Sequence, residues 1–270
     1  MSTDTAKPRE GAQAVHRTLA LLRGFGDSPN DLSASDLARR TGLALSTTHR
    51  LLQAMTAAGF LEQDPDTARY RLGPTVAELG RAAYYRRGLH RAEPELADLS
   101  ERTGVVADLA VRVGAHAVIL VGGSLEGDNR RTLRRPLHST ALGKVLMAWS
   151  DLTDGQIGEL APLTAQTDRT ITDQRTLLEE LSRVRAAGFA LNDGESAAGV
   201  RSIAVPVLDA DGNARFALAL RSSPEVLVSA RLEWFTEQAA ACAAALEVVL
   251  LPPGQRRSSD QRGRATAVVR

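Results

Sequence analysis

The chain has 270 residues, of which 43% are hydrophobic and 24% charged, and its formal net charge at pH 7 is +1. This composition is typical of a globular protein with one large or two smaller domains, and it excludes collagen-like and highly charged disordered chains. No apolar run is long enough to cross a membrane, and the first residues lack the apolar core of a secretory signal. Cys242 is the only cysteine, so no intrachain disulfide can form. We therefore expect a cytoplasmic protein with no membrane partner.

Both ends of the chain, residues 1–12 and 251–270, are predicted to be disordered. The segment from Pro252 to Arg270 contains five arginines and one aspartate, a net charge of +4, and shows no apolar periodicity. Such a composition is typical of a solvated, disordered tail. Contact of this basic tail with nucleic-acid phosphates is the alternative.

Residues 13–73 carry the pattern of a helix-turn-helix. A short helix is predicted to begin at Ser33, where Asp36 stands at the right spacing for a capping box. Gly42 ends this helix with a tight turn, and a longer helix follows over residues 45–58 until Gly59. A short helix, a glycine turn and a longer helix are typical of this motif. An earlier helix is predicted from the helical spacing of Ala14, Thr18, Leu19 and Leu22.

The longer helix divides into two faces when its residues are placed at 100° per residue. On the face predicted to be exposed, Arg50 can pair with guanine and Gln53 with adenine in the major groove of DNA. Ser46 and Thr47 lie near the helix start, where backbone amides favour a phosphate. We therefore predict that this helix enters the major groove. Its exposed face comprises Ser46, His49, Arg50 and Gln53, and its core face comprises Leu45, Thr48, Leu51, Leu52 and Met55.

A β-hairpin is predicted directly after this helix. Two short strands, residues 60–63 and 69–73, flank an Asp- and Pro-containing turn. A hairpin in this position makes the motif a winged helix-turn-helix. Arg69 and Arg71 alternate with Tyr70 and Leu72, so one side of the second strand is predicted to be basic and the other buried. We expect both arginines to contact DNA.

Residues 74–91 are predicted to form a linker helix. An apolar stripe runs along it, beside two tyrosines. We interpret the stripe as a surface that packs against a second copy of the chain, and an ordinary helix within one domain is the alternative. The stripe comprises Val76, Leu79, Ala83 and Leu89.

Residues 92–250 are predicted to form an α+β domain around a mainly antiparallel sheet. Four arginines at positions 130, 131, 134 and 135 are either solvated charges or an anion-binding edge strand. Helices are predicted near residues 94–103, 139–149, 173–187 and 229–250, and strands near residues 105–113, 117–121, 189–192, 203–208 and 215–221.

No sequence pattern of a catalytic or metal site stands out. The chain lacks nucleotide-binding, zinc-protease and C-x-x-C patterns, and its five histidines are scattered. We therefore expect no enzymatic activity, no metal and no cofactor. An enzyme that uses the C-terminal cavity, and a DNA-binding oligomer whose C-terminal domain senses nothing, are kept as alternatives.

Motifs along the chain from about Gln13 to Leu250 resemble, in consistent order, those of IclR-type transcriptional regulators. Because many separate motifs agree, this resemblance is more specific than any single one of them. In the first half they are Leu37–Leu43, Ser46–Leu52, Ala58–Phe60 and Tyr70–Gly73. In the second half they are Pro136–Lys144, Arg169–Thr172, Arg183–Arg185, Gly188-Phe189, Gly199–Arg201, Val205–Val207 and Asp211-Gly212.

The resemblance implies a winged helix-turn-helix, a linker helix and a C-terminal effector domain of GAF-like fold. It also implies a homodimer or a dimer of dimers that binds double-stranded operator DNA and represses or activates transcription under control of a small organic acid or an aromatic compound. Of the two signs of regulation, we expect repression.

The family's effector pocket can be transferred to this chain position by position. The resemblance places backbone-amide contacts at Ala141 and Leu142, and Asn192 where a characterised relative has aspartate. Ser202 stands at a cysteine position, and Ala219 and Arg221 stand at two serine positions. Arg221 either clamps a carboxylate in the pocket or points away from it.

Overall fold

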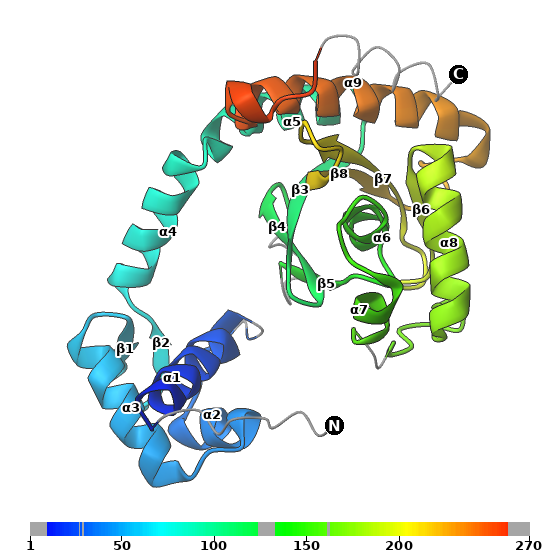
Figure 1. The fold of residues 1–270 in the computed structure, drawn as a ribbon. Helices are drawn as coiled ribbons and strands as arrows, with labels where there is room; N and C mark the ends of the chain where they lie inside the picture. Colours follow the sequence, from blue (N-terminus) through cyan, green and yellow to red (C-terminus); the bar gives the residue numbers. More distant parts are fainter. Residues whose placement is uncertain (1–9, 27, 29, 124–132, 161–162, 259–270) are drawn as a thin grey trace. The chain divides into compact units, whose positions relative to one another are not determined.

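The computed structural model describes residues 10–26, 28, 30–123, 133–160 and 163–258 (Figure 1). These residues group into two compact units, one up to Tyr84 and the other from Tyr85 onward. No helix in the described part of the chain combines the length and the apolar character needed to cross a membrane.

The N-terminal unit is a winged helix-turn-helix, as the sequence predicts. Its wing is tied to the helices, because Leu32 and Tyr70 exchange two backbone hydrogen bonds of 2.9 and 2.8 Å. The core is formed by Leu21, Phe25, Leu32, Ala34, Leu37, Leu52, Met55, Leu61 and Tyr70. In chain order the elements are α1 Glu10–Gly26, α2 Ala34–Thr41, α3 Leu45–Ala57, β1 Leu61–Gln63 and β2 Tyr70–Leu72.

The start of α2 is fixed by local chemistry. The Asp36 amide donates to Ser33 Oγ at 3.1 Å, and the Ser33 amide donates to Asp36 Oδ2 at 3.3 Å. This reciprocal pair is the predicted capping box. Gly42 ends the helix at φ 68°, a conformation that favours glycine. The turn between α2 and α3 is thus set within ten residues of sequence.

Two burial predictions in this unit are wrong. Leu45 is 45% exposed because it is the first residue of α3, where no element among the described residues covers it. Leu72 is 43% exposed because it ends a strand of three residues whose buried side chain is Tyr70.

Helix α4 (Pro74–Arg86) is shorter than the predicted linker helix. Gly88 adopts φ 70° and ends the helical run, and a single 3-10 turn follows at Leu89–Arg91. Leu89 is buried and therefore does not continue the stripe of α4. The other stripe residues stay at the surface of the described structure, where Leu79 is 53% exposed.

The C-terminal unit is an α+β domain around a curled six-stranded sheet. Its strand order is β5-β4-β3-β8-β7-β6, and every neighbouring pair is antiparallel. The strands are β3 Val106–Val113, β4 His116–Val121, β5 Arg134–Pro136, β6 Ala190–Asp193, β7 Arg201–Leu208 and β8 Ala214–Ser222. The helices are α5 Ala92–Thr103, α6 Ala141–Ala148, α7 Asp154–Gly158, α8 Gln174–Ala187 and α9 Leu232–Leu250.

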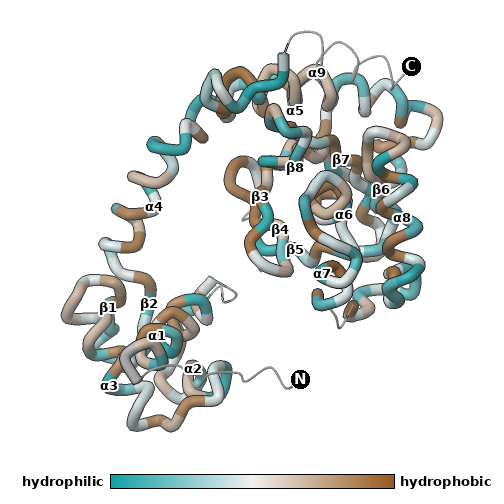
Figure 2. Tube along the Cα trace, in the orientation of Figure 1, coloured by the Kyte–Doolittle hydropathy of each residue, from teal (hydrophilic) through white to brown (hydrophobic). Residues whose placement is uncertain are grey.

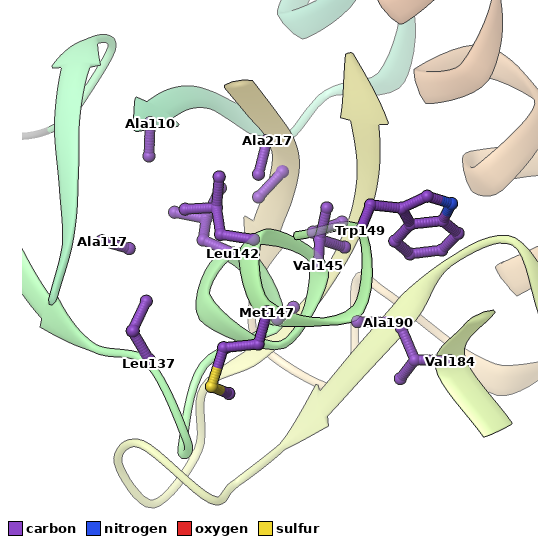
Figure 3. Packing of buried hydrophobic residues seen from close by; sticks show 14 of the residues in the cluster. Ala110, Ala117, Leu137, Leu142, Val145, Met147, Trp149, Val184, Ala190 and Ala217 are labelled. Atoms are coloured by element: carbon purple, nitrogen blue, oxygen red, sulfur yellow. The ribbon is translucent and has the colours of Figure 1, made fainter. Parts of the chain in front are cut away.

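Helix α6 lies inside the curl of the sheet, while α5 and α9 pack on the opposite face of the sheet (Figure 1). The sheet presents small side chains to α6, among them Ala110, Ala117 and Ala217 (Figure 3), and these allow a close approach. Gly143 of α6 faces Leu137, the residue after β5, where a Cβ atom would lie 2.2 Å from the Leu137 carbonyl oxygen. The start of α6 is thereby held tightly against the loop that follows β5.

Helix α8 covers the outer side of α6. Hydrophilic and hydrophobic residues alternate along it (Figure 2), and its buried side carries Leu177, Leu181 and Val184. Its first turn is capped by Asp173, which accepts from the Thr176 amide at 2.9 Å. The helix therefore closes the core with one apolar face and exposes the other.

Both predicted disordered ends are shorter than expected where the structure describes them. Helix α1 already begins at Glu10. At the other end, the Ala210 amide donates to the Gln255 carbonyl at 2.9 Å, and Arg257 pairs with the buried Glu247. The composition of the tail does not indicate these contacts, because Ala210 and Glu247, with which the tail interacts, lie outside it. Residues 1–9 and 259–270 lie outside the described residues, as do the arginines at 130 and 131.

Candidate DNA-binding face and effector cavity

The predicted recognition face of α3 points away from the protein core. Ser46, His49, Arg50 and Gln53 are exposed, Thr47 is partly buried, and Thr48, Leu52 and Met55 on the opposite side are buried. The core side is reinforced by a hydrogen bond of 3.1 Å from Thr48 Oγ1 to the Ala44 carbonyl. Packing of the core face thus orients four polar side chains together toward solvent.

The start of α3 is chemically suited to an anion. Ala44 stands at the N-cap and supplies no side-chain acceptor, and the first turn contains no acidic residue. The backbone amides at the start of a helix need an acceptor, and the helix dipole favours a negative one. A nucleic-acid phosphate is such an acceptor.

The two wing arginines already have partners within the protein. Arg69 Nη1 donates to the Asp31 carbonyl at 2.9 Å and lies 3.8 Å from Asp36 Oδ2. Arg71 Nε donates to Glu62 Oε2 at 2.8 Å. Both arginine side chains remain about half exposed, with 48% and 54% of their surface accessible. Their charge is therefore partly offset before any ligand binds.

The tip of the wing is organised by Asp64. Its Oδ1 accepts from the Thr67 amide at 2.7 Å and from the Asp66 amide at 3.0 Å. The Thr67 bonds hold the pKa of Asp64 below its ordinary value. The tip thus carries negative charge, which the sequence analysis did not weigh against the two arginines.

In the C-terminal unit, a small cavity lies between the start of α6 and the curled sheet. Strand register places Asn192, Ser202 and Arg221 side by side in one row across β6, β7 and β8. Leu142 and Ala219 also line the cavity, so five of the six positions taken from the resemblance come together. Ala141 is fully buried and is not a lining residue. The sequence analysis missed Asp108, Ile119, Thr140, Ser196 and Val200, and it noted Arg135 only as part of an arginine run.

Arg221 faces this cavity. Its Nε donates to Asp108 Oδ2 at 3.2 Å, and Asp108 Oδ1 accepts from the Gly123 amide at 2.7 Å. Asp108 is 1% exposed, so its charge depends on these partners. Arg135 also lines the cavity, and burial together with the nearby Arg221 charge lowers the pKa of Arg135. A lone aspartate in the apolar strand β3 was the signal that could have revealed this cluster.

The Asn192 side chain organises the turn after β6. Its Oδ1 accepts from the Glu195 and Ser196 amides at 2.9 and 3.3 Å. Its Nδ2 donates to Ser196 Oγ at 2.8 Å and to Ser202 Oγ at 3.3 Å. Because both ends of the amide are engaged, Asn192 shapes the cavity wall through the position of this turn.

A buried lysine ties α6 to the same turn. Lys144, 1% exposed, donates to Glu195 Oε1 at 2.6 Å, to Glu180 Oε1 at 2.9 Å and to the Leu191 carbonyl at 3.1 Å. Burial raises the pKa of Glu195, and this cost of desolvation outweighs the opposing attraction of Lys144. The helix, the turn and the cavity wall therefore form one connected polar structure.

Other reactive groups do not extend this site. Among the residues that the structure describes, no three His, Cys, Asp or Glu side chains gather as metal ligands would. Burial raises the pKa of Cys242 to about 12, so its thiol stays protonated at neutral pH. Cys242 is one of the buried residues of α9.

A winged helix-turn-helix whose second motif helix exposes a polar face, joined to a domain with a charged cavity, is the architecture of a ligand-responsive class of DNA-binding regulators. Two family models match the chain: the IclR helix-turn-helix domain over residues 14–65 and the bacterial transcriptional regulator IclR C-terminal domain over residues 87–248. The chain belongs to the IclR family of transcriptional regulators.

Named relatives agree with this assignment. The chain is 32% identical to the HTH-type transcriptional regulator XynR of Escherichia coli, over 84% of this chain and 92% of XynR. It is 32% identical to the HTH-type transcriptional regulator BhcR of Paracoccus denitrificans, over 95% and 93%. The crystal structure of an IclR homolog from Microbacterium hydrocarbonoxydans, complexed with 4-hydroxybenzoate, is similar with a TM-score of 0.73 and 26% identity, over 88% of this chain and 98% of that one.

Proposed function

We propose that this protein binds specific double-stranded operator DNA as a homodimer and represses transcription under control of a small organic ligand in the C-terminal cavity. The observation that carries the proposal is the joint exposure of Ser46, His49, Arg50 and Gln53 on α3, above a helix start without a side-chain cap. Arg50 and Gln53 have the chemistry to pair with base edges, while Ser46 and Thr47 are placed for a phosphate.

Arg69 and Arg71 of the wing are proposed as backbone contacts of lesser weight. Each would exchange part of an existing interaction, with Asp36 or Glu62, for a phosphate oxygen. Exposed ion pairs of this kind contribute little stability, so the exchange costs little.

The homodimer is supported by apolar side chains exposed on two helices of the N-terminal region. Val15 and Leu19 of α1 are 58% and 46% exposed, and Leu79 of α4 is 53% exposed. Burial of such side chains against a second copy would stabilise the pair through the hydrophobic effect. A two-fold symmetric protein would then present two α3 helices to the two halves of an operator.

The test uses fluorescence anisotropy with duplexes taken from the region upstream of the protein's own gene. Arg50→Ala is expected to weaken specific binding by about 1–3 kcal/mol. Arg175→Ala is the matched control, because Arg175 lies on α8 with its side chain 89% exposed. Equal binding of the native protein to a scrambled duplex would refute the DNA-binding proposal.

The ligand part of the proposal is supported by the charged cavity and by the relative that was crystallised with 4-hydroxybenzoate. The alternative, a DNA-binding oligomer without a sensing domain, is favoured by the small size of the cavity, about 40 Å³. A thermal-shift screen separates the two, because a ligand at 100 times its Kd adds about 2.7 kcal/mol of stability.

A further inference from the structure

Two acidic side chains contact the same buried lysine next to the cavity wall. Lys144 Nζ donates to Glu180 Oε1 at 2.9 Å and to Glu195 Oε1 at 2.6 Å, and the lysine side chain is only 1% exposed. The other carboxyl oxygen of Glu195, Oε2, is buried and has no hydrogen-bond partner among the described residues. One cation thus faces two acidic groups, and one of their oxygens is left unsatisfied.

The surroundings of Glu195 favour its neutral form. Burial is the main reason that its pKa is raised, and the negative charges of Glu180 on α8 and Asp193 on β6 add to the effect, against the attraction of Lys144 on α6. A buried oxygen without a partner costs less as part of a neutral acid than as part of a carboxylate. The cations that pair with Glu180 and Asp193 are Arg183, Arg169 and Arg201.

The backbone of Glu195 is fixed from two sides. Its amide donates to Asn192 Oδ1 at 2.9 Å, and its carbonyl accepts from Thr170 Oγ1 at 2.7 Å. The carbonyl of the preceding Gly194 accepts from Thr167 Oγ1, also at 2.7 Å. While these bonds persist, the side chain cannot swing out to water, so Glu195 gains or loses its proton in the buried position.

We propose that Glu195 makes the order of the cavity wall depend on pH: the turn at residues 192–196 is held while Glu195 keeps its proton and loosens when the proton is released to water. With the proton on Oε2, the charges of Lys144 and Glu180 balance. Without it, a second buried negative charge competes for the same lysine. The turn carries Ser196, which lines the cavity, so its release alters the wall.

This proposal goes beyond the proposed function, and its tests need neither DNA nor a ligand. The first test measures hydrogen exchange at residues 194–196 of the full-length protein from about pH 5 to about pH 9, corrected for the intrinsic rate of exchange at each pH. Protection of these amides should fall by about tenfold or more as the pH rises. Glu195→Gln, which is neutral at every pH, should keep the protection throughout. Unchanged protection in the native protein would overturn the proposal.

Urea unfolding at a series of pH values gives a second readout with a defined sign. The pKa of Glu195 is raised above its ordinary value of 4.5. The stability that the native protein has relative to Glu195→Gln is therefore complete below that value and is lost as the pH rises through the folded-state pKa. Over this interval, the ratio of the two unfolding constants should change by up to about tenfold per pH unit. A ratio that does not vary with pH would contradict the proposal.

Two variants of α8 separate the effect of charge from that of packing. Glu180→Gln leaves Lys144 with one acidic partner, so ionised Glu195 no longer competes for it and the turn should stay protected at high pH. Glu179→Gln removes the same charge from the adjacent position, where the side chain is 58% exposed, and should keep the native pH dependence. Equal behaviour of these two variants would overturn the proposal. Circular dichroism establishes that each variant is folded, and Glu180→Gln carries the test if Glu195→Gln does not fold.

Discussion

The guanidinium of Arg257 is paired with the carboxylate of Glu247, a side chain on α9 that is completely buried. Glu247 also accepts from the Leu208 amide of β7 at 3.3 Å. The last described residues of the chain thus pack against the C-terminal unit, where Arg257 neutralises the buried Glu247 carboxylate.

Arg257→Ala is expected to destabilise the C-terminal unit strongly, because it leaves a buried carboxylate without its cation. Loss of one partner of a buried pair typically costs about 3–5 kcal/mol. Urea unfolding followed by circular dichroism measures the loss. The double variant Arg257→Ala/Glu247→Gln, which also removes the charge, should recover much of the stability. A single variant as stable as the native protein would show that the pairing contributes nothing.

Because of the ion pair between Asp193 and Arg201, the stability of the fold is expected to vary with pH in the acidic range. Arg201 Nε and Nη2 donate to the two Asp193 carboxylate oxygens, each at 2.9 Å, and this holds the Asp193 pKa below its ordinary value of 3.8. A lowered pKa means that the stability is present above about pH 4 and is lost as the pH falls through the folded-state value.

Asp193→Asn should therefore lower the free energy of unfolding near neutral pH, and the difference from the native protein should shrink at more acidic pH. The expected loss is below about 1 kcal/mol, because Asp193 is 35% exposed and solvent screens the pair. Urea unfolding at a series of pH values measures it. A difference that stays constant into the acid range would contradict the assignment.

The amide of Asn192 should matter for the cavity through the turn that it holds. Asn192→Ala leaves the Glu195 and Ser196 amides without their acceptor, at an expected cost of about 1–3 kcal/mol. Asn192→Asp keeps an oxygen for those amides and is the matched control. Hydrogen exchange at residues 194–196 should rise in the alanine variant alone. Equal exchange in both variants would mean that the turn is held by other contacts.

Patterns that are local in sequence were predicted well. The capping box of Ser33 and Asp36 and the turn at Gly42 depend on residues a few positions apart, so the chain encodes them without reference to the rest of the fold. The outward face of α3 was found for the same reason, since helical periodicity alone separates Arg50 from Leu52. At the ends of elements the same reasoning failed, as Leu45 and Leu72 show, because burial there depends on which element lies above.

The sequence alone therefore determined the winged helix-turn-helix, the antiparallel α+β domain and the exposed polar face of α3, because each follows from periodicity, capping and turn chemistry. Only the tertiary structure decided that Arg221 faces the cavity and pairs with Asp108, 113 positions earlier in the chain. It likewise decided that the tail returns to Glu247. Such contacts arise from strand register and packing. These bring together residues that are far apart in the chain, and no local sequence pattern indicates that the residues will be in contact.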